Sequence, residues 1–97
     1  MRELVSILHN LINKLYKAYE NETEIIVSLE NNFLTFNHTI KLSDLNIEEE
    51  GDNYNIYIVD TWLEVNIKIT PKVNVEYNGE DTFLISDDNL KIQICFL

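Results

Sequence analysis

Carboxylates are the side chains of this sequence most able to do chemistry, and many of them gather in short clusters. The 97 residues contain seventeen Asp and Glu but only seven Lys and Arg, so the formal net charge is −10. Clustered carboxylates can bind a cation, act as a general acid–base pair or attract a basic partner. The clusters are Glu48, Glu49, Glu50 and Asp52; Glu80 and Asp81; and Asp87 and Asp88.

The spacing of these acids argues against cation binding and catalysis. A calcium loop needs the alternating ligand spacing of an EF-hand and a closing Glu, and the 48–52 and 87–89 segments have neither feature. A catalytic carboxyl needs a pKa raised by burial, whereas most acids here fall in expected turns or at outward strand positions. Two glycines are too few for a glycine-rich phosphate loop. We therefore expect no enzymatic activity, no metal and no cofactor.

The other reactive side chains are isolated. His9 falls on the polar face of an expected helix and His38 in an expected turn, so we interpret both as solvated residues. Cys95 is the only cysteine, which excludes an intramolecular disulfide and a thiolate metal cluster, and we interpret it as a small apolar residue of the last strand. Direct nucleic-acid binding is disfavoured because it depends on clustered Lys and Arg.

These side chains must be positioned by one domain that spans residues 1–97. Residues 1–20 predict an amphipathic helix, because apolar residues recur there at spacings of three and four. The apolar positions are Leu4, Leu8, Leu11, Leu15 and Tyr19. Residues 1–17 contain three bases and one acid and carry a charge of +2. Residues 18–97 contain sixteen acids and four bases and therefore carry −12.

Residues 23–97 alternate between apolar and polar side chains, which predicts a sheet. Expected turns lie at Asn31-Asn32, Asn37-His38, Ser43-Asp44, 50–53, Asn78-Gly79 and 87–89. Pro71 should interrupt the strand ladder. The prediction is an α+β fold, in which one N-terminal amphipathic helix packs on a curled antiparallel β-meander of about seven to nine short strands.

The alternation changes phase near Asp60-Thr61. Ile56 and Ile58 are apolar at even positions, whereas the apolar residues from Leu63 to Ile69 occupy odd positions. A β-bulge or a hairpin turn is consistent with this change. Asp-Thr is a poor hairpin turn, which favours a bulged strand over residues 54–69. A continuous strand would place the 50–53 and 78–81 turns at the same end of the sheet, and a hairpin would place them at opposite ends.

The acidic surface therefore carries the functional hypothesis. It is consistent with simple solvation that prevents edge-to-edge aggregation, or with an anionic surface that binds a basic protein. Aromatic residues near the charges would supply the affinity. The expected partner-binding residues are the three clusters given above together with Tyr54, Tyr57, Trp62 and Glu64, and Trp62 is expected to point outward.

In size and charge the chain is similar to phage-borne inhibitors of host defence, of which the anti-CRISPR proteins are the most populous group. That resemblance implies a small inhibitor that binds a basic nucleic-acid-binding effector or nuclease as a nucleic-acid mimic. One alternative is an immunity protein that neutralises a co-encoded basic toxin. Another is a non-enzymatic structural or adaptor subunit. A homodimer formed through an uncovered strand edge is compatible with all three.

The sequence also indicates the compartment. Residues 1–16 contain no apolar run of signal-peptide length, and no stretch approaches the ~20 apolar residues of a membrane span. We therefore expect a cytoplasmic protein, in the host cell if it is phage-encoded, with no membrane partner.

Overall fold

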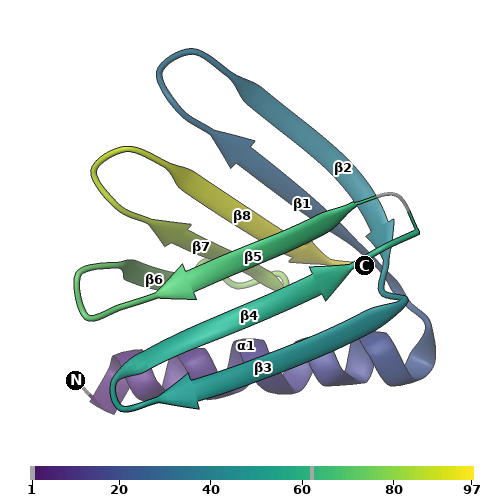
Figure 1. The fold of residues 1–97 in the computed structure, drawn as a ribbon, viewed down its shortest axis with the longest axis horizontal. Helices are drawn as coiled ribbons and strands as arrows, with labels where there is room; N and C mark the ends of the chain where they lie inside the picture. The colour runs from purple at the N-terminus through teal and green to yellow at the C-terminus, as the bar shows by residue number, and fades with distance from the viewer. Residues whose placement is uncertain (1, 62) are drawn as a thin grey trace.

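The computed structural model describes residues 2–61 and 63–97 and contains one helix and eight strands (Figure 1). The α+β class, the N-terminal helix and the antiparallel meander are confirmed. The elements are α1 (Arg2–Asn21), β1 (Glu24–Glu30), β2 (Thr35–Lys41), β3 (Asp44–Glu50), β4 (Asn53–Val59), β5 (Glu64–Ile69), β6 (Asn74–Tyr77), β7 (Thr82–Ser86) and β8 (Lys91–Phe96).

The strands form two antiparallel sheets rather than one curled sheet. The larger sheet has the order β2-β1-β8-β7-β6, and the smaller has the order β3-β4-β5. The pairing of β1 with β8 joins residues far apart in the sequence, with Val27 opposite Ile94. Figure 1 shows the smaller sheet in front of the larger one and α1 running along the lower side. Because α1 lies against β3 and β6, which are edge strands of the two sheets, it closes the gap between the sheets on that side.

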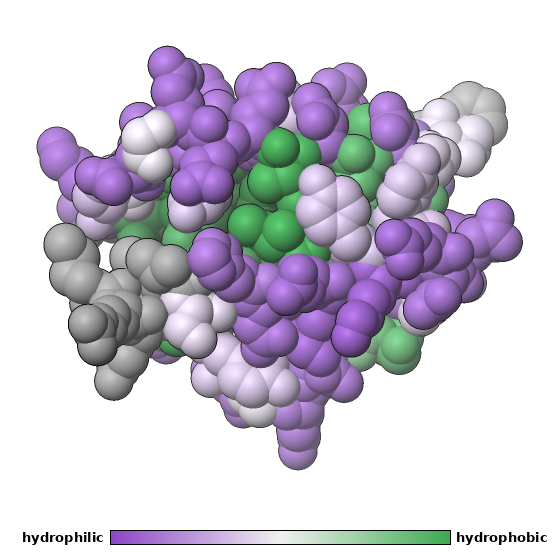
Figure 2. Space-filling view, turned by 90° about the horizontal axis from the view of Figure 1, so that it is seen from below, coloured by the Kyte–Doolittle hydropathy of each residue, from purple (hydrophilic) through white to green (hydrophobic). Residues whose placement is uncertain are grey.

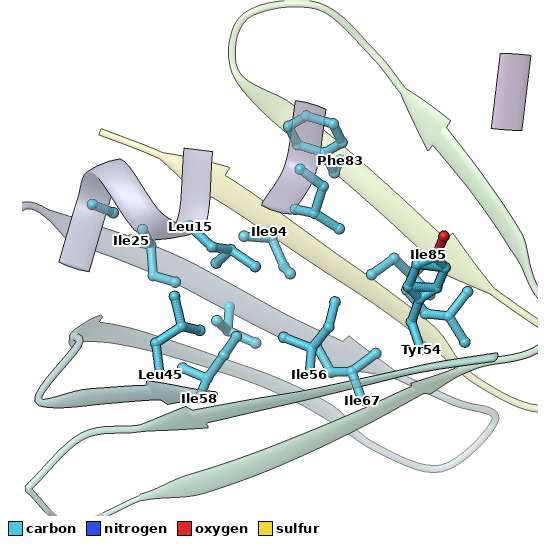
Figure 3. Packing of buried hydrophobic residues seen from close by; sticks show 14 of the residues in the cluster. Leu15, Ile25, Leu45, Tyr54, Ile56, Ile58, Ile67, Phe83, Ile85 and Ile94 are labelled. Atoms are coloured by element: carbon cyan, nitrogen blue, oxygen red, sulfur yellow. The ribbon is translucent and has the colours of Figure 1, made fainter. Parts of the chain in front are cut away.

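The core lies between the two sheets and α1. The helix contributes Leu8, Leu11, Leu15 and Ala18, whose spacings of three and four place them on one face. Figure 3 shows Ile56, Ile58 and Ile67 of the smaller sheet opposite Ile25, Ile85 and Ile94 of the larger one. Phe83, Leu11, Leu15 and most of the core isoleucines are almost fully buried. Each such side chain stabilises the fold by about 1.5–3 kcal/mol relative to an exposed position.

The α1 side of the molecule is mostly hydrophilic. Figure 2 shows a small hydrophobic area between two hydrophilic bands there. Ile12 and Ile47 are partly buried against the core, and Tyr16 and Tyr19 remain exposed. No described helix is long and apolar enough to cross a membrane.

The expected bulged strand over residues 54–69 is wrong, because β4 and β5 are separate strands of a hairpin. Asp60 and Leu63 close it with two backbone hydrogen bonds, of 2.8 Å from Asp60 N to Leu63 O and 3.4 Å from Leu63 N to Asp60 O. In this register residue n of β4 lies opposite residue 123 − n of β5, so even positions pair with odd ones. That pairing explains the change of phase, since Ile56 lies opposite Ile67 and both face the core.

The expected turn at Asn37-His38 is also wrong. Both residues belong to β2, which continues from Thr35 to Lys41 without a break. Asn37 lies opposite Ser28 and His38 opposite Val27, because β2 pairs with β1 along its whole length. The turns expected at Asn31-Asn32, 50–53, Asn78-Gly79 and 87–89 all connect neighbouring strands. Gly51 and Gly79 have φ values of 61° and 74°, which glycine adopts at little cost.

Candidate functional site

The outward side of the smaller sheet gathers four of the acids on one surface. Side chains alternate across a strand, and Leu45, Tyr54, Ile56, Ile58, Ile67 and Ile69 point into the core. The residues between them must therefore point outward. We call this outward surface the acidic face. It comprises Asp44, Asn46, Glu48 and Glu50 of β3, Asn53, Asn55, Tyr57 and Val59 of β4, and Glu64, Asn66 and Lys68 of β5.

The strand register fixes the arrangement of the acidic face. Asn46, Tyr57 and Asn66 form the central row, with the half-buried Tyr57 in the middle. Asp44 and Glu64 flank Val59 at one end, and Glu48 and Glu50 lie toward the other end. Strands are spaced about 4.8 Å apart and rise about 3.4 Å per residue, so the acids frame an area of roughly 10 by 20 Å.

The electrostatics of the acidic face are one-sided. Asp44, Glu48, Glu50 and Glu64 are all exposed, and Lys68 is the only base, so the face carries a net charge of −3. Carboxylates two residues apart on a strand, such as Glu48 and Glu50, are about 6–7 Å apart along it. This spacing is close to that of successive phosphates along a polynucleotide. Chemically, the face can attract a cationic surface and present carboxylate and amide acceptors to it.

Two of the expected partner-binding residues, Glu49 and Tyr54, occupy inward positions of their strands. Tyr54 is only 7% exposed, and its hydroxyl donates a 3.3 Å hydrogen bond to Oε1 of Glu49. Burial of the ring raises the pKa of Tyr54, and the neighbouring charge of Glu49 raises it further. The ring of Tyr54 is therefore a core residue rather than a surface for a partner. Asp52 is exposed in the turn between β3 and β4.

The cluster at Glu80 and Asp81 lies apart from the acidic face. Lys14 of α1 donates a hydrogen bond to Asp81, and the backbone N–H of Phe96 donates to the carbonyl of Asp81 at 2.9 Å. The hydrogen bond with Asp81 raises the pKa of Lys14, although burial opposes the shift. Glu80 and Asp81 both have positive φ values, so these contacts hold an unusual turn against the helix. The Asp81 charge is thus already paired within the chain.

The cluster at Asp87 and Asp88 lies at the opposite end of β7 from Glu80 and Asp81. Oδ1 of Asp87 accepts backbone hydrogen bonds of 2.8 Å from Asn89 and 2.9 Å from Leu90. These bonds lower the pKa of Asp87, because they stabilise the charged carboxylate. The three sequence clusters therefore do not form one surface. Trp62, expected to point outward, lies outside the described residues.

The remaining reactive residues do not converge on a site. Among residues 2–61 and 63–97, no three His, Cys, Asp or Glu are grouped as metal ligands would be. His38 lies on β2, where its ring stacks on Phe36 with centroids 5.9 Å apart, and His9 is exposed on α1. Cys95 is half-buried on β8, opposite Ile26 of β1 and Thr82 of β7.

Sequence reasoning identified part of the acidic face. Glu48, Glu50, Tyr57 and Glu64 were expected to bind a partner and do lie on it. Asp44 and the outward asparagines were missed. On β3 and β4 the missed residues share the alternation of Glu48, Glu50 and Tyr57, which would have indicated them. Only Asn66 also required the β4–β5 hairpin register. No protein-family model, curated protein or solved structure matches this chain.

Proposed function

We propose that this chain is a non-enzymatic binding protein whose acidic face occupies the nucleic-acid-binding surface of a basic partner protein. The observation that carries the proposal is the gathering of four exposed carboxylates around Tyr57 on one side of a three-stranded sheet. The partner chemistry that fits is a cleft lined by Lys and Arg, because such a cleft binds phosphates by charge. The biological role proposed for this binding is inhibition of the anti-CRISPR type.

The acidic face suits this role because it is built on paired strands. Its carboxylates need little ordering when a partner binds, since their backbone is already fixed by the β3–β4 and β4–β5 ladders. Charge supplies association rate and selectivity, whereas Tyr57 and the neighbouring amides supply apolar contact and hydrogen bonds. An immunity protein for a basic toxin would use the same face, and gene neighbourhood separates the two roles.

The experiment is capture of a partner from host-cell lysate on three immobilised proteins. The first is the natural chain. The second is the face variant, which carries Asp44→Asn, Glu48→Gln, Glu50→Gln and Glu64→Gln. The third is the control variant, which carries Glu20→Gln, Glu22→Gln, Glu24→Gln and Glu76→Gln at exposed positions off the face. Both variants lose four charges from the original −10, so both carry −6.

The proposal predicts a basic protein that the natural chain and the control variant retain at low salt and that the face variant loses. Added duplex DNA or RNA should release that protein from the natural chain, because both ligands occupy one surface. Equal retention by all three proteins, or retention that nucleic acid does not affect, contradicts the proposal.

A further inference from the structure

On the side of the molecule opposite α1, the described residues leave a hollow between the two sheets. There a groove separates β5 from the β1–β2 hairpin, and it has a volume of about 520 Å³. Its apolar lining is Leu29, Leu34, Phe36, Leu63, Val65, Leu90 and Ile92. A second hollow of about 220 Å³ continues along β5 and shares Asn66, Leu90 and Ile92 with the first. Together they make a groove, which we call the β5 groove, that follows β5 from Leu63 to Lys68.

The backbone of β5 offers unpaired groups to this groove. In an antiparallel pair, hydrogen-bonded and non-hydrogen-bonded residue pairs alternate. Asp60 and Leu63 are hydrogen-bonded to each other, so Val65, Ile67 and Ile69 also bond to β4. The N–H and C=O groups of Glu64, Asn66 and Lys68 therefore point away from β4. Among the described residues, β5 pairs with β4 alone.

The opposite wall is held in place by its own turn. Oδ1 of Asn31 accepts hydrogen bonds of 2.8 Å from the backbone N–H groups of Phe33 and Leu34. Asn31 N also donates to the carbonyl of Leu34 at 2.9 Å. Phe33 is nevertheless 97% exposed and Leu34 61% exposed. The turn thus fixes the backbone that presents the side chains of Phe33 and Leu34 to water beside the groove.

The charges along the β5 groove favour a basic segment as its ligand. Glu30, Glu64 and Asp87 line it against the single base Lys68, so the lining carries a net charge of −2. A second copy of the chain would bring its own net charge of −10, and pairing β5 with β5 would place two acidic faces side by side. A basic segment gains from the same charges.

We propose that the β5 groove binds an extended segment of a partner protein, with alternating apolar and basic residues, as an added strand on β5. The backbone of the segment pairs with Glu64, Asn66 and Lys68, its apolar side chains cover Leu29, Phe36 and Ile92, and its basic side chains face Glu64. The site shares Glu64, Asn66 and Lys68 with the acidic face, but it depends on the backbone groups of β5, which the acidic face does not use, so either proposal can fail without the other.

The test uses a blocked eight-residue peptide that alternates Lys with Val, titrated into the isotopically labelled full chain and followed by NMR. The expected result is saturable shifts of the backbone amides of residues 64, 66 and 68, with slower hydrogen exchange at those amides. Asn66→Pro should weaken binding at least tenfold, because proline removes an N–H that faces the groove. Asn66→Thr keeps that N–H and should bind like the natural chain.

Variants of the peptide test the proposal without any change to the protein. Replacing Lys by Glu should weaken binding at least tenfold. Two further peptides carry a methyl group on the backbone nitrogen of every Lys or of every Val. One of them should lose binding and the other should keep it, because the backbone N–H groups of only one residue type point toward β5. Equal binding by Asn66→Pro and Asn66→Thr, equal effects of both methylation patterns, or no shift at residues 64–68 up to about 1 mM peptide overturns the proposal. Dimerisation of the chain through β5 overturns the choice of occupant.

Discussion

Asp87 shows how one carboxylate can organise a turn. Its Oδ1 accepts the N–H groups of Asn89 and Leu90, and these bonds lower its pKa. Because its pKa is lowered in the fold, ionised Asp87 stabilises the protein at pH values above its unfolded-state pKa, near 3.9. This contribution disappears as the pH falls through the folded-state pKa. Asn can accept the same hydrogen bonds without charge, whereas Ala accepts neither, so the two substitutions separate the charge from the turn.

We expect Asp87→Ala to lower the Tm at every pH, because the turn loses both hydrogen bonds. Asp87→Asn should cost less at pH 7, and its difference from the natural chain should shrink as the pH falls toward 2. Thermal unfolding followed by circular dichroism between pH 7 and 2 measures this. A constant difference between Asp87→Asn and the natural chain across that range would show that the Asp87 charge contributes nothing.

At the scale of elements, the open edge of β5 gives a prediction for proline. Asn66 directs its N–H away from β4, whereas Ile67 directs its N–H to β4. Asn66→Pro should therefore leave the fold intact with a Tm shift of only a few degrees, whereas Ile67→Pro should lose a ladder bond and core packing and cost about 3 kcal/mol or more. Circular dichroism and urea unfolding of both variants test the register. Similar damage from the two prolines would mean that the β4–β5 hairpin is misassigned.

The elements divide into those that local chemistry predicts and those that it does not. The helix follows from the spacing of Leu8, Leu11 and Leu15, and the β6–β7 turn follows from Asn78-Gly79. The pairing of β1 with β8 joins residues more than sixty positions apart, and no turn residue specifies it. The change of phase near Asp60 is the same for a bulge and for a hairpin, so only the backbone distinguishes them. The acidic face depends on that choice and was predicted only in part.

At the scale of the whole molecule, the charge of −10 should make stability depend on salt. The molecule measures 32 by 32 by 26 Å. The Debye length is about 30 Å at 0.01 M salt and about 8 Å at 0.15 M, so the acids repel one another across the fold only at low salt. We expect the Tm to rise by roughly 2–6 °C between 0.01 and 0.15 M NaCl, because 1 kcal/mol of added unfolding free energy raises the Tm of a small domain by about 4–8 °C.

The face variant and the control variant provide matched comparisons for the salt effect. Each lacks four acids, so each should show a smaller rise in Tm than the natural chain. Thermal unfolding at the two NaCl concentrations measures all three proteins. A Tm that is independent of salt, or that falls as salt is added, would show that long-range repulsion does not limit stability.

The central claim is that the acidic face binds a basic partner by imitating a polynucleotide, and the association rate constant tests it most directly. The rate constants of the captured partner with the natural chain, the face variant and the control variant would be measured by stopped flow from 0.02 to 0.5 M NaCl. The account predicts that association of the natural chain and the control variant slows steeply with salt. It also predicts that the face variant associates at least about tenfold more slowly at low salt, because steering contributes 10–10³-fold. Equal rate constants for all three proteins, or rates that do not change with salt, would contradict it.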